Sequence, residues 1–132
     1  DTEPAEIPAA TREPAEALSP LLERVADICS ARGVQPVIVF DPAVYVDGEG
    51  EAYTGTDADC LAAFESVCAE NGIVFIDLTD SYIREYAGSC QLPYGFVNTT
   101  PGEGHMNRVG HRLFAQEVYE TIKALEEEQN GI

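Results

Sequence analysis

Apolar residues recur every three or four positions along four stretches of the chain, which is the pattern of amphipathic helices. Ser19 is a favourable N-cap for the first helix, and Asp57 is the corresponding cap of the second. Each of these two helices ends at a glycine, and the third helix begins with a cap at Thr79 or Asp80. The predicted helices cover about residues 19–33, 57–72, 79–88 and 107–125.

Two short apolar segments interrupt the helical period, the continuous run Val37–Phe40 and residues 73–78, in which four apolar residues precede Asp77. A short run without alternation is typical of a strand that is buried on both faces of a parallel sheet. Asp41 closes the first run and Asp77 lies near the end of the second. Helices alternate with these strands along the chain, which predicts an α/β protein whose parallel sheet is covered by helices. The remaining stretches, residues 43–56 with a turn at 47–48 and residues 89–105, are predicted to be loops.

A chain of 132 residues allows a single domain. Three prolines among Glu and Ala predict that residues 1–17 are a linker-like or unfolded lead-in. At the other end, residues 127–132 are predicted to be a frayed tail. The predicted domain therefore spans residues 18–126. Two strands are too few for a parallel sheet that stands alone, so a part of the sheet is expected to be missing.

Charge narrows the range of partners, because 24 acidic residues against 7 basic ones give a net charge of −17. Such a surface repels nucleic-acid phosphates and anionic membranes, so we expect no nucleic acid partner. No apolar run is long enough to cross a bilayer, and no membrane insertion is expected.

The four cysteines, Cys29, Cys60, Cys68 and Cys90, form no C-x-x-C pair, which argues against zinc and against thioredoxin-type redox chemistry. Cys60 and Cys68 share one predicted helix, about 12 Å apart along its axis, and cannot bridge each other. A disulfide from Cys90 to a helix and buried free thiols both remain open. We expect no metal and no cofactor.

Candidate chemistry lies where the strands end and where the last helix begins. Asp41 and Asp77 lie at strand carboxyl ends, where open α/β sheets bind ligands; each either lines such a site or caps the following turn. His105 precedes the last helix, whose positive end favours the neutral imidazole of a general base. Glu103 is placed to accept the Nδ1 proton of His105, which leaves Nε2 free to take a proton from a nucleophile. Asn98 either lines the pocket or braces the loop.

The stretch "GHMNRVGHRLFAQEVYETI" resembles the last motif of the SGNH (GDSL-like) serine esterases and acetyltransferases, H-x-N-x-x-G-H followed by the closing helix. The upstream segments "GVQPVIVFDP", "ENGIVFIDLTDSY" and "LPYGFVNTTPGEGH" are similar to the strand, strand-helix and loop that precede it. The resemblance covers about residues 18–125. It implies a three-layer α/β/α flavodoxin-like fold with a parallel sheet, present here in part.

Carried over by position, the resemblance makes His105 the catalytic base and Glu103 the acid that orients it. The family usually has Asp as this acid, and the other common position for it is Gly102 here. His111 matches the second His of the motif, and we expect it to be structural, packing or hydrogen-bonding to the loop.

The chain contains no G-D-S, the motif that carries the nucleophilic serine of the family. None of its five serines suits a nucleophile at a strand end. The resemblance therefore implies the C-terminal half of such a domain, with the nucleophile upstream of this chain. We expect an exported or cell-surface enzyme that acts on a small ester or an acylated carbohydrate. This chain alone would be inactive, and would associate with itself or with a companion N-terminal half that covers its sheet edge.

Two other functions remain open. One is a non-catalytic SGNH-like module that binds a glycan or a protein. The other is a flavodoxin-like domain that holds Mg²⁺ with Asp41 and Asp77.

Overall fold

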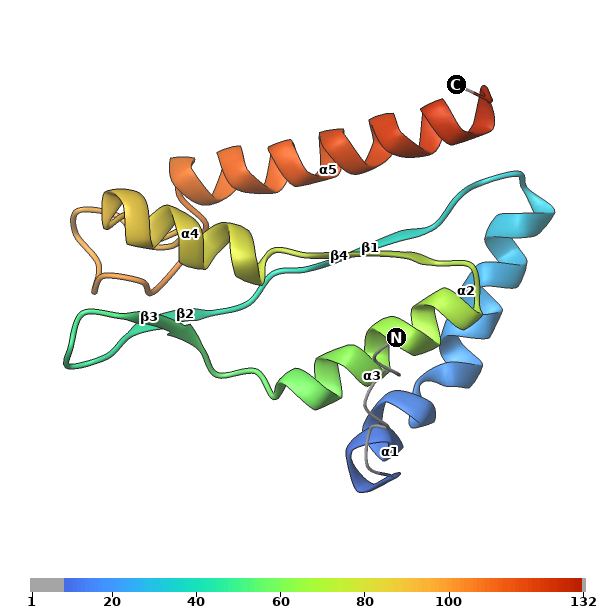
Figure 1. The fold of residues 1–132 in the computed structure, drawn as a ribbon, viewed down its shortest axis with the longest axis horizontal. Helices are drawn as coiled ribbons and strands as arrows, with labels where there is room; N and C mark the ends of the chain where they lie inside the picture. Colours follow the sequence, from blue (N-terminus) through green and yellow to red (C-terminus); the bar gives the residue numbers. More distant parts are fainter. Residues whose placement is uncertain (1–8, 132) are drawn as a thin grey trace, which may run out of the picture. The chain divides into compact units, whose positions relative to one another are not determined.

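The computed structural model describes residues 9–131 and shows helices alternating with short strands (Figure 1). The elements in chain order are α1 (Ala9–Ala17), α2 (Ser19–Ala31), β1 (Val37–Phe40), β2 (Val44–Val46), β3 (Ala52–Thr54), α3 (Ala58–Glu70), β4 (Val74–Asp77), α4 (Thr79–Ser89) and α5 (Arg108–Gln129).

The described residues fall into two compact units. The first unit comprises residues 9–38 and 56–75, and the second unit comprises residues 39–55 and 76–131. The chain passes from the first unit to the second in the middle of β1, returns to the first between residues 55 and 56, and enters the second again in the middle of β4. The first unit contains α1, α2 and α3, whereas the second contains β2, β3, α4 and α5.

Strands β1 and β4 form a two-stranded sheet (Figure 1). The Val74 N–H donates to the Pro36 carbonyl at 3.1 Å, and the Leu78 N–H donates to the Phe40 carbonyl at 3.1 Å. Both partners advance by four residues in the same direction, so the strands are parallel. The α/β class and the parallel pairing predicted from the two apolar runs are therefore confirmed.

Helices α2 and α3 occupy the ranges that the apolar period predicts. Asp57 caps α3 as expected, because its Oδ1 accepts from the Cys60 N–H at 2.9 Å. Ser19 is not the cap of α2; Leu18 holds that position and its side chain makes no capping hydrogen bond. Leu78 takes the same place before α4 instead of Thr79 or Asp80.

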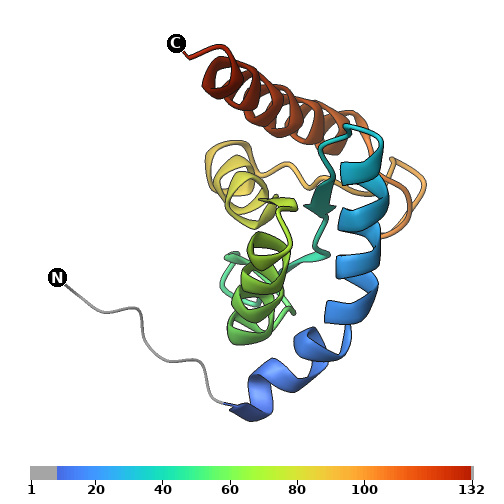
Figure 2. The same cartoon turned by 90° about the vertical axis from the view of Figure 1, so that its right-hand side faces the viewer.

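The lead-in expected to be a linker is helical in the part that the structure describes. Helix α1 spans Ala9–Ala17, and α2 follows after a single residue (Figure 2). Ala15 is only 4% exposed and belongs to the core of the first unit. Ala and Glu favour helix, and the packing of Ala15 in the core stabilises this helix further. Together these two effects outweigh the prolines, which had suggested a linker. Residues 1–8 of this expectation lie outside the described residues.

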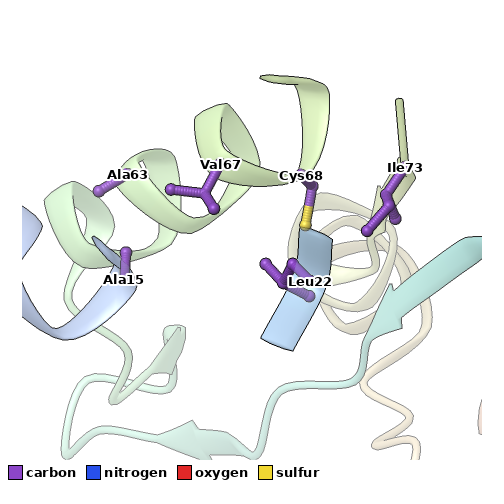
Figure 3. Close-up of a cluster of buried hydrophobic side chains, with 6 residues drawn as sticks. All are labelled: Ala15, Leu22, Ala63, Val67, Cys68 and Ile73. Atoms are coloured by element: carbon purple, nitrogen blue, oxygen red, sulfur yellow. The ribbon is translucent and has the colours of Figure 1, made fainter. Parts of the chain in front are cut away.

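The core of the first unit lies between α1, α2 and α3 (Figure 3). Phe64 and Phe75 pack against this core. Their two rings also meet each other edge to face, with centroids 5.6 Å apart. Its buried side chains are Ala15, Leu22, Ala63, Val67, Cys68 and Ile73.

The second unit contains a β-hairpin where the sequence predicted a loop. Strands β2 and β3 pair antiparallel, with Val44 opposite Thr54 and Val46 opposite Ala52. Asp47 Oδ1 accepts from the N–H groups of Glu49 and Glu51, both at 2.9 Å, so the turn itself lies where the Asp-Gly pair predicted it. The strands escaped prediction because each has only three residues, too few to show an alternating pattern.

Helices α4 and α5 contact each other in the second unit. Arg112 of α5 forms a salt bridge with Glu85 of α4 at 2.9 Å, and the buried Ser81 hydroxyl donates to Glu117. Helix α5 continues to Gln129, so the first residues of the expected frayed tail are helical. Among the helices of residues 9–131, none is long and apolar enough to span a membrane.

The thiols of Cys29, Cys68 and Cys90 are free, and no disulfide ties Cys90 to a helix. Cys68 is fully buried, and this burial raises the pKa of its thiol. Buried thiol rather than disulfide is therefore the state of Cys68 here.

Adjacent leucines of α2 test the core of the first unit. Leu22 is 6% exposed and Leu21 is 60% exposed. We expect Leu22→Ala to lower the free energy of unfolding by about 2–4 kcal/mol, because it leaves a cavity in the core. Leu21→Ala should change it by about 0.5 kcal/mol or less. Urea unfolding followed by circular dichroism measures both, and equal losses would contradict this core.

Candidate functional site around His105

The candidate site lies in the second unit, on the segment of residues 91–107 that joins α4 to α5; we call it the His105 loop. Its two ends are held together by backbone pairing. Tyr94 and Met106 form an antiparallel bridge, and the Gly95 N–H donates to the His105 carbonyl at 3.0 Å. The Asn107 N–H donates to the carbonyl of Pro93 at 2.9 Å. The His105 backbone is therefore fixed to the opposite arm of its own loop, by which we mean residues 92–95.

The side chain of Asn107 joins this loop to α5. Its Oδ1 accepts from the N–H groups of Val109 at 2.9 Å and Gly110 at 3.1 Å, which caps the helix. Its Nδ2 donates to the carbonyls of Leu92 at 2.8 Å and Gly95 at 3.2 Å. One amide thus caps the helix and holds the far arm of the loop, which suits an amide because its nitrogen carries two donors and its oxygen accepts two hydrogen bonds.

Gly110 lets the loop lie against the first turn of α5. A Cβ at this position would stand 2.4 Å from the Pro93 carbonyl oxygen and 2.5 Å from Met106 Cγ. Pro93 is among the fully buried side chains, so the loop has no room to retreat. The glycine in the H-x-N-x-x-G-H pattern therefore has a steric reason in this chain.

The tip of the loop is built from two tight turns. The Thr99 hydroxyl accepts from the Phe96 N–H at 2.8 Å, and the Glu103 N–H donates to the Thr100 carbonyl at 3.0 Å. Gly95 has φ +91°, and a Cβ there would stand 2.9 Å from the Glu103 carbonyl oxygen. Asn98 lies exposed in the first of these turns.

His105 and Glu103 both expose their side chains, on either side of Gly104. Within residues 9–131 no hydrogen bond or ion pair engages either side chain, so the structure does not join the expected acid to the expected base. His105 lies two residues before the N-cap of α5, as the sequence predicted. Its backbone is fixed while its imidazole faces solvent, which is an arrangement that leaves the ring accessible to a reacting group.

His111 lies in the first turn of α5 and its side chain is exposed. Only its backbone takes part in the capped start of the helix, through the hydrogen bond from its N–H to the Asn107 carbonyl at 2.9 Å.

A hollow of about 450 Å³ lies beside the loop. Leu92, Phe96 and Val97 form an apolar part of its lining, and Arg108 and Asn107 line it as well. Phe96 is 54% exposed, so its ring presents apolar surface to solvent. Asn98 does not line this hollow.

Asp41 follows β1 and binds two tyrosine hydroxyls. Its Oδ1 accepts from Tyr82 at 2.6 Å and also from Tyr94. The two rings meet edge to face, with centroids 6.1 Å apart. Burial, followed by the hydrogen bond to Asp41, raises the pKa of both tyrosines above its usual value. Both hydroxyls therefore stay protonated and donate at neutral pH.

This cluster joins residues 41 and 53 positions apart in the chain, and no sequence signal pointed to it. Asp77, by contrast, acts as a turn cap, because its Oδ1 accepts from the Thr79 N–H at 2.9 Å. In the described part of the chain, no group of three His, Cys, Asp or Glu side chains is placed to hold a metal ion. The Mg²⁺ hypothesis thus gains no support.

Comparison of the chain with family models, with curated proteins and with solved structures gave no match. Any function must therefore be argued from the residues and their geometry.

Two glycines test the close contact between the loop and α5. Gly→Ala inside a helix ordinarily stabilises a protein by about 0.5–1 kcal/mol. We expect this gain for Gly88→Ala in α4, where a Cβ meets nothing within 4 Å. For Gly110→Ala we expect the opposite sign, a loss of about 1–3 kcal/mol, because the new methyl group overlaps Pro93. Thermal and urea unfolding measure both, and a stabilised Gly110→Ala variant would contradict the contact.

Substitutions of Asn107 distinguish its role as the N-cap of α5 from its hydrogen bonds to the loop carbonyls, which we call the clasp. Asp keeps the capping oxygen but has no N–H groups for the two loop carbonyls, whereas Ala loses both functions. We expect Asn107→Asp to speed amide exchange at Gly95 while Val109 and Gly110 keep their protection. Asn107→Ala should release all three amides and cost about 1 kcal/mol more for the lost cap. Hydrogen exchange by NMR reads each amide, and intact Gly95 protection in both variants would argue against the clasp.

Proposed function

We propose that this chain is the C-terminal part of an SGNH-type serine esterase or O-acyltransferase in which His105 is the general base. The observation that carries the proposal is the clamped loop: His105 is exposed on a backbone that Asn107 and Gly110 hold against the start of α5. These three residues occupy the His, Asn and Gly positions of H-x-N-x-x-G-H. Their spacing thus has a joint structural purpose, which is to present one imidazole at a fixed place.

The chemistry follows from the position of the imidazole. A serine supplied by residues upstream would attack the ester carbonyl while His105 Nε2 accepts its proton. His105 would then donate that proton to the departing alcohol. Water, or an acceptor alcohol in a transferase, would attack the acyl-enzyme in the same manner. Glu103 would orient the ring by accepting from Nδ1, and the exposure of both side chains leaves them free to turn toward each other.

The proposed fold is a three-layer α/β/α flavodoxin-like domain of which this chain supplies one part. Supporting this, the parallel sheet has only two strands in the described residues, fewer than a sheet of this class usually has. The outer face of α2 is also apolar and exposed, through Leu18, Leu21, Val25 and Ile28. A companion N-terminal half, or a second copy, would cover such surfaces.

We propose a small ester or an acylated carbohydrate as substrate, and a place of action outside the cytoplasm. The hollow beside the His105 loop has an apolar part that is suited to the acyl portion of such a substrate. Neither His105 nor Glu103 lines this hollow. Asp41 remains a proposed contact for substrate, and its Oδ1 accepts from two tyrosine hydroxyls.

A non-catalytic module that binds a glycan or a protein is the second candidate. Two observations favour it: the chain has no G-D-S, and the acid and base are not joined. Ser81, which lies closest to β4 along the chain, is buried and donates to Glu117, so it is not placed as a nucleophile.

The two histidines give a matched test in the protein expressed from the complete gene. With a p-nitrophenyl ester as substrate, we expect His105→Ala to lower kcat by about 10²- to 10⁴-fold, the usual contribution of a general base. His111→Ala should keep activity within about threefold, since His111 has no proposed part in proton transfer. Undiminished activity in His105→Ala would refute the esterase proposal. A wild-type protein that neither turns over esters nor reacts with a fluorophosphonate would establish the binding module instead.

A further inference from the structure

Asp41 connects the buried part of the second unit to the His105 loop. It follows β1, and its carboxylate accepts from Tyr82 of α4 and from Tyr94 of the loop. Tyr82 is fully buried, so its ring and hydroxyl have a fixed position. Tyr82 thereby holds the carboxylate in place, and the carboxylate in turn holds Tyr94.

Tyr94 lies on the loop arm that pairs with the segment containing His105, one residue before Gly95. Its backbone pairs with that of Met106, directly after His105, and the next residue, Gly95, donates its N–H to the His105 carbonyl at 3.0 Å. The hydrogen bond at Asp41 is therefore one residue removed from the bond that fixes the His105 backbone. In the described residues the imidazole has no side-chain partner, so its position depends on this backbone alone.

We propose that Asp41 and Tyr94 are positioning residues, which hold the arm of the His105 loop from the strand side and so set the place of the imidazole. Asn107 holds the same arm from the helix side, through Gly95 and Leu92. Two anchors from different elements restrain the arm more than one, because a single anchor leaves rotation about its own contact. A carboxylate suits this purpose, since hydrogen bonds to an ionised acceptor are about twice as strong as neutral ones.

The catalytic consequence rests on the proposed function, whereas the positioning itself can be measured in residues 1–132 without any substrate. Tyr94→Phe removes one hydroxyl and keeps the ring against Tyr82. Tyr45→Phe is the matched control, because Tyr45 lies 50% exposed on β2 and its ring, which the substitution keeps, packs against Tyr53.

We expect Tyr94→Phe to speed amide exchange at Gly95 by about tenfold or more, the effect of losing a hydrogen bond to a charged group. The Leu78 amide, which donates to Phe40, should keep its protection and so report that the unit stays folded. Asp41→Asn should have a smaller effect of the same kind, because the amide oxygen still accepts. The double variant should exchange no faster than Tyr94→Phe alone. Unchanged Gly95 exchange in Tyr94→Phe, or an equal change in Tyr45→Phe, would overturn the proposal.

Kinetics in the protein from the complete gene distinguish this inference from the function on which it rests. We expect Tyr94→Phe to lower kcat about tenfold with KM nearly unchanged, since the ring of Tyr94 still lines the hollow. If His105→Ala abolishes activity while Tyr94→Phe leaves kcat unchanged, the positioning inference falls and the esterase stands. If Tyr94→Phe speeds amide exchange at Gly95 while His105→Ala retains full activity, the esterase proposal is refuted and the positioning inference is supported.

Discussion

The side-chain amide of Asn107 is the interaction on which the candidate site depends. Four hydrogen bonds meet at this one group: two accepted from the first turn of α5 and two donated to the far arm of the loop. A helix start leaves N–H groups without partners, and a loop that folds back leaves carbonyls without partners. Asn107 satisfies both sets at once, so helix and loop form as one piece.

A general base must be held in place and must still reach a group that arrives from solvent. In the second unit these two demands are met by different parts of the same residue. The backbone of His105 is bonded to Gly95, while the imidazole lies exposed. The restraint comes from neighbours on either side, the Asn107 amide and the Asp41–Tyr94 contact, which act on the loop rather than on the ring. The proposed catalytic side chain is therefore exposed on a loop whose backbone is held by several hydrogen bonds.

The described residues also present surfaces that a self-sufficient α/β domain would cover. The parallel sheet of the described residues has two strands, and the leucines and valine along the outer face of α2 are exposed. Burying apolar surface is the main favourable term in folding, so such surfaces are suited to another segment or another copy. The strong negative charge works in the opposite direction, because like-charged copies repel each other.

The sequence by itself determined the features that depend on neighbouring residues. The ranges of α2, α3 and the start of α5, the cap at Asp57 and the two strands of the parallel pair all follow from local spacing and local hydrogen bonding. Only the tertiary structure decided the rest, because its causes lie far apart in the chain. Helix α1 is ordered by the packing of Ala15 against the core, and the three-residue strands of the hairpin are too short to show a period. Asp41 meets Tyr94 across 53 positions, a contact that no local pattern encodes since it depends on where β1 and the His105 loop arrive in space.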